Sequence, residues 1–404
     1  MQSTLTPMPS VAVENAPAFR GHILALDGLR GLAISMVMLM HFTALQKPRT
    51  ELGRVLHEVL GAGWIGVYLF FVLSGFLITG ILLDTKESPH YFVNFFARRS
   101  LRIFPLYYGY LAILLCVGVP MAIRTGLMDS PNVRYVGAHQ GYFWLYGTNV
   151  LLAERGAFLS GFVDHLWSLA IEEHFYLIWP AVLFFVPNRK LLAVCCGIVG
   201  MAIGCRAGFT ATGVWPLANY LFTPCRMDSL AIGGIVAVAV RLGYPEQKML
   251  DHARWLFVVC GLLVISYFVL RNQIFFVKQA YDVVGKSFTA IFFAAMLVLA
   301  IDSSPSIVGR SFSHPILRFL GKYSYGLYVF HLPVWLLKMR LLPPERLASH
   351  LGSGTLVWML DVVIPFALSV GIAFLSWHFY EKKFLKFKEY FEPQKKLFAG
   401  GATS

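Results

Sequence analysis

The stretch DGLRGLAISMVMLMH, residues 27–41, places two ionisable side chains, Arg30 and His41, inside the first long apolar run of the chain. Eleven residues of α-helix at about 100° each return both side chains to one helix face. An isolated charge at bilayer depth costs about 2.5 kcal/mol or more, so ionisable residues kept there usually face a polar interior. The pair therefore predicts a membrane helix that borders a ligand or proton path.

The composition is that of a membrane protein. Hydrophobic residues make up 57% of the 404 and charged residues only 14%, the mean hydropathy is +0.64, and a soluble domain would carry roughly 25% charge. We predict an all-α polytopic membrane protein with about ten spans of roughly 20 residues each. The apolar runs are residues 23–45, 59–83, 103–123, 164–186, 190–206, 219–240, 254–270, 281–301, 318–340 and 355–378.

The net charge of +13 does not predict a nucleic-acid partner, because the lysines and arginines cluster at helix ends rather than along one stripe. If the loop before Arg99 is cytoplasmic, the positive-inside rule also places the other basic clusters, and hence both chain termini, in the cytoplasm. These clusters are Lys86, Arg98, Arg99 and Arg102; Arg189 and Lys190; Arg241, Lys248 and Arg254; Arg310, Arg318 and Lys322; and Lys382, Lys383, Lys386, Lys388, Lys395 and Lys396.

This topology requires that the weakly apolar stretch Tyr142–Ala153 does not cross the membrane, so we predict that it is interfacial or re-entrant. The short loops leave no room for a soluble domain. We expect a cytoplasmic N-terminal tail over residues 1–22, one membrane domain over 23–380 and a basic cytoplasmic tail over 381–404.

Counting about 1.5 Å per residue from the helix ends sorts the polar side chains of the spans into two levels. Cations dominate the level near the cytoplasm, where an anionic ligand would arrive, and acids and bases meet in the outer half. The cytoplasmic level holds Asp27, Arg30, Arg99, Arg102, Tyr107, Tyr108, Arg318 and Lys322. The outer level holds His41, His165, Glu172, Glu173, His174, Arg226, Asp228, Lys286 and His331.

Two of these groups suggest chemistry. Arg99 and Arg102, spaced i, i+3, share a helix face and could bind phosphate, although arginines at a helix end also serve as topology anchors. His41 could act as a general base that Glu172 or Glu173 orients, or it could only hydrogen-bond a neighbouring helix.

Three further residues allow both a structural and a supporting role. Arg226 and Asp228 point in different directions on one helix, so each needs a partner elsewhere, and an ion pair explains them as well as catalysis does. His331 follows the small and tyrosine-rich run GKYSYGLYVF, for which helix packing is the default interpretation.

Together these segments resemble the acyltransferase-3 family, membrane O-acyltransferases of bacterial surface glycans, exported polysaccharides, Nod factors and macrolides. The motifs that carry the resemblance are spread along the chain. They are LDGLRG (26–31) with His41, GVYLFFVLSGFL (66–77), RSLRIFPLYY (99–108), HLWSLAIEEHFYLIWP (165–180), RMDSL (226–230) and SYGLYVFH (324–331).

The resemblance implies a ten-helix domain in the bacterial cell membrane that moves an acyl group, commonly acetyl, from cytoplasmic acyl-CoA to a carbohydrate hydroxyl, with no bound cofactor. Arg30, His41, Arg99 and Arg102 match the family's functional positions. His174 departs from the family, which more often has glutamine there. Some relatives carry an extracytoplasmic SGNH domain, and we expect none here.

On this basis Arg99 and Arg102 would hold the donor phosphates and Arg30 would guide the thioester inward. His41 would either deprotonate the acceptor hydroxyl or accept the acyl group itself. Arg226, Lys286 or a tyrosine hydroxyl could stabilise the oxyanion. The rival interpretation is a transporter or flippase of a glycan or small anionic solute, although the chain has no internal repeat or matched pair of broken helices.

Overall fold

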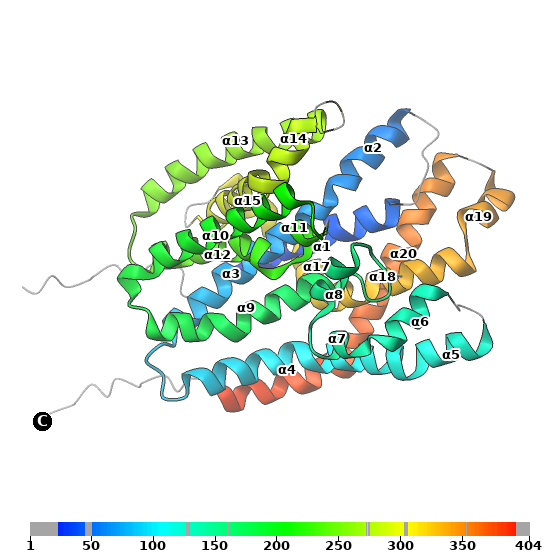
Figure 1. Cartoon of the computed structure of the whole chain (residues 1–404), viewed down its shortest axis with the longest axis horizontal. Coiled ribbons are helices and arrows are strands. Elements are labelled where there is room, and N and C mark those ends of the chain that lie inside the picture. Colours follow the sequence, from blue (N-terminus) through cyan, green and yellow to red (C-terminus); the bar gives the residue numbers. More distant parts are fainter. Residues whose placement is uncertain are drawn as a thin grey trace, which may run out of the picture.

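The computed structural model describes residues 23–44, 51–126, 130–159, 161–215, 217–271, 273, 275–302, 306–352 and 354–392. All regular structure within these residues is helical, and none of them is in a strand, which confirms the all-α prediction. The long helices run side by side in an elongated bundle (Figure 1).

The first half of the chain forms α1 (Leu24–Thr43), α2 (Glu51–Gly61), α3 (Gly66–Asp84), α4 (Tyr91–Leu111), α5 (Val119–Thr125), α6 (Pro131–Ala138), α7 (Gln140–Trp144), α8 (Thr148–Arg155), α9 (Leu166–Phe185) and α10 (Leu191–Thr212). The second half forms α11 (Ala218–Leu221), α12 (Met227–Arg241), α13 (Glu246–Leu270), α14 (Phe275–Ala280), α15 (Lys286–Ala300), α16 (Ile307–Phe312), α17 (Pro315–Lys322), α18 (Ser324–Leu341), α19 (Pro344–Leu351), α20 (Thr355–Ser376) and α21 (Lys382–Leu385). Tighter or wider helical turns complete the chain: η1 (Ala62–Ile65), η2 (Ala112–Gly118), η3 (Asn188–Lys190), η4 (Thr223–Cys225), η5 (Tyr281–Gly285), η6 (Trp377–Glu381) and η7 (Lys386–Phe391).

Eight helical stretches within the described ranges are long and apolar enough to cross a bilayer, which agrees with a multi-pass membrane protein. They correspond to eight of the ten apolar runs. These stretches are Leu24–Thr43, Gly53–Asp84, Tyr91–Thr125, Leu166–Phe185, Asn188–Thr212, Glu246–Leu270, Lys278–Ala300 and Thr355–Phe391.

The two other predicted spans are shorter or interrupted. The run 219–240 becomes α12, whose 15 residues rise only about 22 Å, less than the roughly 30 Å of a bilayer core. The run 318–340 is divided at Tyr323 between α17 and α18. Both helices pack inside the bundle, α12 against α3 and α10, and α18 against α20 and α1, so protein rather than lipid surrounds much of their surface.

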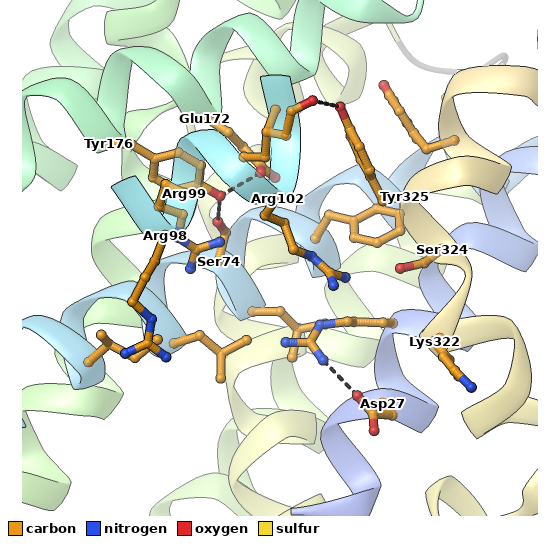
Figure 2. Close-up of a pocket in the computed structure, with 18 of the residues that line it drawn as sticks. Asp27, Ser74, Arg98, Arg99, Arg102, Glu172, Tyr176, Lys322, Ser324 and Tyr325 are labelled. Atoms are coloured by element: carbon orange, nitrogen blue, oxygen red, sulfur yellow. Dashed lines mark hydrogen bonds and ion pairs between the residues drawn. The ribbon is translucent and has the colours of Figure 1, made fainter. Parts of the chain in front are cut away.

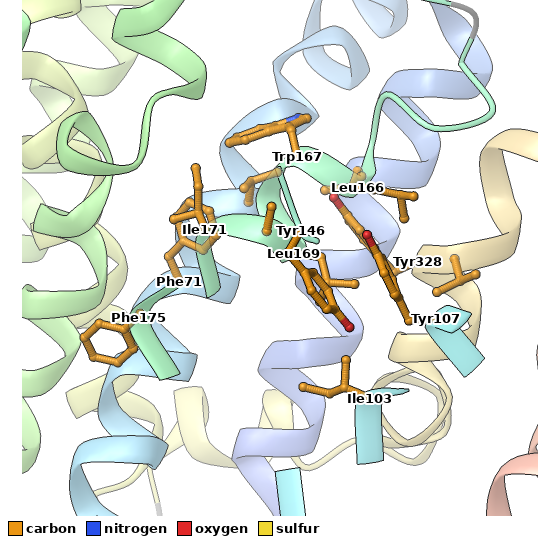
Figure 3. Packing of buried hydrophobic residues seen from close by; sticks show 14 of the residues in the cluster. Phe71, Ile103, Tyr107, Tyr146, Leu166, Trp167, Leu169, Ile171, Phe175 and Tyr328 are labelled. Atoms are coloured by element: carbon orange, nitrogen blue, oxygen red, sulfur yellow. The ribbon is translucent and has the colours of Figure 1, made fainter. Parts of the chain in front are cut away.

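The stretch Tyr142–Ala153 does not cross as a helix, as predicted. Its chain runs through α7 and α8, of five and eight residues, and turns between them at Tyr146, whose φ is +56°. The turn is buried among aromatic side chains of the core, where Figure 3 shows Tyr146 with Trp167 and Tyr328. Tyr107 donates a hydrogen bond to the Phe143 carbonyl over 2.6 Å. Irregular backbone is tolerated at membrane depth when protein groups satisfy it in this way.

Glycines allow the helices that carry the polar residues to approach closely. A Cβ on Gly31 of α1 would lie 2.0 Å from the Leu317 carbonyl oxygen of α17, and one on Gly321 would lie 1.8 Å from the carbonyl oxygen of Asp27. The same holds for α3 and α12, where a Cβ on Gly233 would lie 2.1 Å from the Val72 carbonyl oxygen. Small residues at such crossings are typical of membrane helix packing.

We expect Gly233→Val to force α12 away from α3 and to destabilise the protein by about 1–3 kcal/mol or more, because the clash is with backbone. The measurement is the temperature at which detergent-solubilised protein loses its monodisperse gel-filtration peak. Gly197→Val on α10 is the control, since a Cβ there meets no heavy atom within 4 Å. Equal stability of the two variants would contradict the close-packing role.

The basic segment after α20 forms further helical turns. η6, α21 and η7 continue the last long helix and lie against α4, as the red and cyan ribbons of Figure 1 show. Of the two predicted tails, residues 1–22 and 393–404, including Lys395 and Lys396, lie outside the described residues.

Candidate functional site

A pocket of about 1040 Å³ opens between α1, α3, α4, α9 and the α17–α18 region, with Trp377 and Lys388 of the C-terminal segment on its wall. Cations dominate it, since the only acidic side chains among the described lining residues are Asp27 and Glu172. Figure 2 shows the arginines of α4 on one side and Asp27 and Lys322 on the other. The basic lining residues are Arg30, Arg98, Arg99, Arg102, Arg318, Lys322 and Lys388.

The pocket thus unites most of the residues that the sequence placed at the cytoplasmic level. Arg30 makes an ion pair of 2.7 Å with Asp27 on the same helix. The close crossing of α1 and α17 explains why Arg318 and Lys322 lie on the same pocket. Tyr107 and Tyr108 do not line it and instead bond the carbonyls of Phe143 and Trp144.

Further along the pocket wall, a chain of hydroxyls ends on a carboxylate. The guanidinium of Arg99 lies 5.0 Å from the ring centroid of Tyr176. The Tyr176 hydroxyl donates to Glu172 Oε2 over 2.7 Å and accepts a hydrogen bond from Ser74 (Figure 2). Ser74 is therefore part of a hydrogen-bonded network with a partly buried acid.

Tyr328 and Ser168 form another part of the wall. The Ser168 hydroxyl donates to the Tyr328 oxygen over 2.5 Å, and the Tyr328 hydroxyl donates to the His165 carbonyl, also over 2.5 Å. The ring centroids of His165 and His331 lie 5.6 and 5.7 Å from that of Tyr328. Tyr328 thus contacts both the pocket and the histidines behind it.

Those histidines come from three helical regions. His41 Nδ1 lies 2.9 Å from the Val37 carbonyl and 3.2 Å from His331 Nε2. His331 Nδ1 in turn faces the Leu327 and Tyr328 carbonyls at 3.2 and 2.8 Å. A ring nitrogen that faces a carbonyl must carry the proton, so both rings are assigned the Nδ1–H tautomer in their neutral form.

This assignment leaves His41 Nε2 unprotonated, with no hydrogen-bond partner among the described residues, which is the form that a general base or nucleophile needs. His331 Nε2 accepts from His41 and helps to hold its ring. The supporting position predicted for His331 thus has a direct contact with His41. Within the described ranges, no three His, Cys, Asp or Glu side chains are arranged as metal ligands.

The hypothesis that a glutamate orients His41 is wrong for this structure. The hydrogen bonds of the His41 ring are made with Val37 and His331, while Glu172 bonds Tyr176. Glu173 points elsewhere, and its buried Oε1 has no hydrogen-bond partner in the described residues. Neighbours on one helix cannot face the same way, and the pocket side of α9 is the side that carries Glu172.

Arg226 and Asp228 do have separate surroundings, as their spacing predicts. Asp228 forms a buried ion pair of 2.9 Å with Arg206 and accepts a hydrogen bond from Ser287 over 2.6 Å. Its contacts are therefore those of a structural ion-pair network. Arg206 was absent from the predicted site because nothing in its own helix marks it.

The Arg226 guanidinium is fully buried, and its three nitrogens have no hydrogen-bond partner among the described residues. It lies 4.0 Å from the centroid of the Tyr68 ring and between 5.3 and 5.6 Å from those of Phe71, Trp167 and Tyr220. Cation–π contacts of this kind stabilise a desolvated cation.

The arrangement of a basic pocket, a hydroxyl-lined wall and a histidine cluster agrees with a comparison to known protein families. The family model described as an acyltransferase domain matches residues 23–378. The chain belongs to the acyltransferase-3 family. That match covers the histidine cluster and all the described pocket-lining residues except Lys388, and it confirms the resemblance drawn from the motifs.

Curated relatives of this acyltransferase-3 member carry related names. The Putative peptidoglycan O-acetyltransferase YrhL of Bacillus subtilis is 28% identical over 388 residues, which are 89% of this chain and 54% of that protein. The Peptidoglycan O-acetyltransferase OatA of Listeria monocytogenes is 28% identical over 328 residues, 78% of this chain and 50% of that protein. The chain spans about half the length of the curated relatives it matches. No solved structure matches it.

Proposed function

We propose that this protein is an integral-membrane O-acyltransferase that moves an acyl group, acetyl by default, from acyl-CoA to a hydroxyl of a carbohydrate or glycosylated acceptor. The observation that carries the proposal is the basic pocket whose wall, at Tyr328, touches the histidine cluster of His41, His165 and His331. An anionic donor and a base would thereby occupy neighbouring sites formed by residues from different helices.

The charge of the pocket supports acyl-CoA as the donor. CoA carries about four negative charges, two on its pyrophosphate and about two on its phosphomonoester. Arg99 and Arg102 project from one face of α4 into the pocket. Among the described lining residues of that pocket, the basic side chains outnumber the two carboxylates, so its charge is positive. Planar guanidinium groups suit bidentate contacts to phosphate. Arg30, held by Asp27, would guide the pantetheine arm between them.

His41 is proposed as the reacting group. In one route its Nε2 takes the proton of the acceptor hydroxyl, whose oxygen attacks the thioester carbonyl while the thiolate of CoA leaves and takes that proton. In the other, Nε2 attacks the thioester and the thiolate of CoA leaves; the acyl-imidazolium then passes its acyl group to the acceptor hydroxyl, whose proton goes to the thiolate. Both routes need the Nδ1–H tautomer that Val37 and His331 impose.

Other groups on the pocket wall and in the interior would support the reaction. Glu172, Tyr176 and Ser74 form a polar network on the pocket wall that could accept or relay a proton. Glu173 and Arg226 have buried polar atoms with no hydrogen-bond partner among the described residues. Of the groups offered for the oxyanion we rank Arg226 first, and the aromatic side chains around it would have to rearrange. Asp228 would act only through Arg206.

The names of the relatives support a surface carbohydrate as acceptor, since they refer to peptidoglycan O-acetylation. The distribution of basic residues supports a bacterial cell membrane location, with the basic pocket open to the cytoplasm and both termini on that side. The acyl group would then enter from the cytoplasm and reach the acceptor from within the bundle.

Transfer of radiolabel from [¹⁴C]acetyl-CoA tests the function. Membranes that contain the protein should pass label to endogenous glycans, whereas membranes from the same host without it should not. Label in neither sample, across several acyl-CoAs and acceptor-bearing membranes, would overturn the acyltransferase proposal and favour transport. If the protein transfers label only to water, the proposal of a carbohydrate acceptor would be refuted, whereas acyl-CoA would remain the donor.

A further inference from the structure

Part of the basic pocket lies against the C-terminal segment and differs in character from the rest. Trp377 of η6 and Lys388 of η7 line the pocket there. The guanidinium of Arg102 lies 5.7 Å, and the ammonium of Lys322 5.9 Å, from the centroid of the Trp377 ring. Arg102 of α4 and Lys322 of α17 thus lie over one half-buried indole, and Lys388 of η7 lines the same pocket.

These cations repel one another and have little to compensate them. Lys388 is close enough to Arg98, Arg99 and Arg102 to interact electrostatically with each. Within the described residues, no carboxylate lies within 4.0 Å of the charged nitrogens of these four side chains, Lys388, Arg98, Arg99 and Arg102. Glu381 is nearby, but its carboxylate accepts from Ser376 over 2.9 Å. A cluster of this kind is stabilised by a bound anion of high charge.

We propose that Trp377, Lys388, Arg102 and Lys322 form a nucleotide subsite that takes the phosphomonoester-bearing purine nucleoside of the donor, the 3′-phosphoadenosine end of CoA. The inference rests on the proposed function, because it assigns a part of the donor to a part of that pocket. The indole face stacks on the purine, and the cations bind the phosphomonoester, which carries about two negative charges.

This subsite gives the C-terminal segment a role in donor choice. Acyl donors that lack the phosphomonoester, such as an acylated 3′-dephospho-CoA, would leave Lys388 and Arg102 without a counter-charge. The segment therefore selects CoA over otherwise similar thioesters. Lys388, which lies ten residues beyond the end of the family match at residue 378, would be a specificity residue of this pocket.

The first experiment measures binding, which needs neither acceptor nor turnover. The full chain is purified in neutral detergent and titrated with adenosine 3′,5′-bisphosphate, AMP or inorganic phosphate, with the thermal unfolding midpoint as readout. We expect the bisphosphate to bind about tenfold more tightly than AMP, and phosphate alone only weakly.

Variants then locate the effect. Lys388→Gln should weaken the bisphosphate about fivefold to tenfold and leave AMP almost unchanged, whereas Trp377→Leu should weaken both nucleotides. Lys386→Gln is the matched control, because Lys386 is an exposed lysine of the same segment and does not line the pocket. Equal binding of AMP and bisphosphate, or no effect of Lys388→Gln, would overturn the inference. Equal stabilisation by phosphatidic acid in mixed micelles would also overturn it, in favour of a lipid phosphate.

A kinetic comparison separates the subsite from the function. The KM for 3′-dephospho-acetyl-CoA should exceed that for acetyl-CoA about tenfold in the unaltered protein, and Lys388→Gln should reduce that ratio to about two. Transfer without such a ratio would refute the subsite alone. Selective bisphosphate binding without transfer from any acyl-CoA would refute the proposed reaction and leave the nucleotide subsite in place.

Discussion

His41→Ala is expected to lower acyl transfer from acetyl-CoA by about a hundredfold to ten-thousandfold, with normal insertion and abundance. In the His41 ring, Nδ1 is hydrogen-bonded to Val37 and His331, so Nε2 keeps its lone pair for the reaction. An alanine removes that lone pair without placing a new charge in the interior. The measurement is the initial rate of label transfer in membranes that contain equal amounts of each protein.

The matched control is His252→Ala, which removes an exposed histidine from α13 that also bonds a carbonyl one turn earlier. It should leave the rate unchanged. A rate near that of the unaltered protein for His41→Ala would remove His41 from the reaction. The same assay without acceptor separates the two routes, because label bound to the protein in the unaltered chain and absent from His41→Ala would favour the acyl-imidazole.

The Arg99→Ala, Arg102→Ala double variant is expected to raise the KM for the acyl donor about tenfold to a hundredfold and to change kcat little. Both guanidinium groups line the pocket, Arg99 over the ring of Tyr176 and Arg102 over that of Trp377. Their loss removes contacts that bound donor and transition state share, so the effect should be on binding. Initial rates over a range of acetyl-CoA concentrations provide both constants.

Removing two positive charges also changes the overall field of the protein, so a variant of equal charge is needed. Arg189→Ala, Lys190→Ala serves, because both residues are exposed on η3 and neither lines the pocket. It should leave the donor KM within about twofold of the unaltered value. An unchanged donor KM in the Arg99, Arg102 variant would refute phosphate binding there and return these arginines to the role of topology anchors.

The sequence predicted those pocket residues whose relative positions depend on a single helix. The spacing of Arg99 and Arg102 defines a face whatever the neighbours are, and both side chains line the pocket. Depth counting placed His331 at the same level as His41, and the structure brings the two rings into contact. The glutamates were harder to assign. Their spacing says that Glu172 and Glu173 point in different directions but not which of them lines the pocket, and the hydrogen bonds of the described residues join neither to His41.

Other site residues could not be found from their own segment. Lys388 belongs to a run of lysines that the positive-inside rule explains fully, and only the packing of η7 on α4 brings it to the pocket. Arg206 lies in an apolar helix with no acid one turn away, and its partner Asp228 is 22 residues further along the chain. A contact between distant segments leaves no periodic trace in either of them.

The sequence by itself determined the class of this protein: helical, membrane-spanning, with cations grouped at helix ends and ionisable residues kept within apolar runs. These properties follow from local physics, since each span must satisfy its own backbone and pass through the bilayer. Only the tertiary structure decided that His41 bonds His331, that Glu172 bonds Tyr176 and that Lys388 lines the pocket. Those pairings depend on how the helices rotate and cross, which contacts between many side chains and backbone atoms set together.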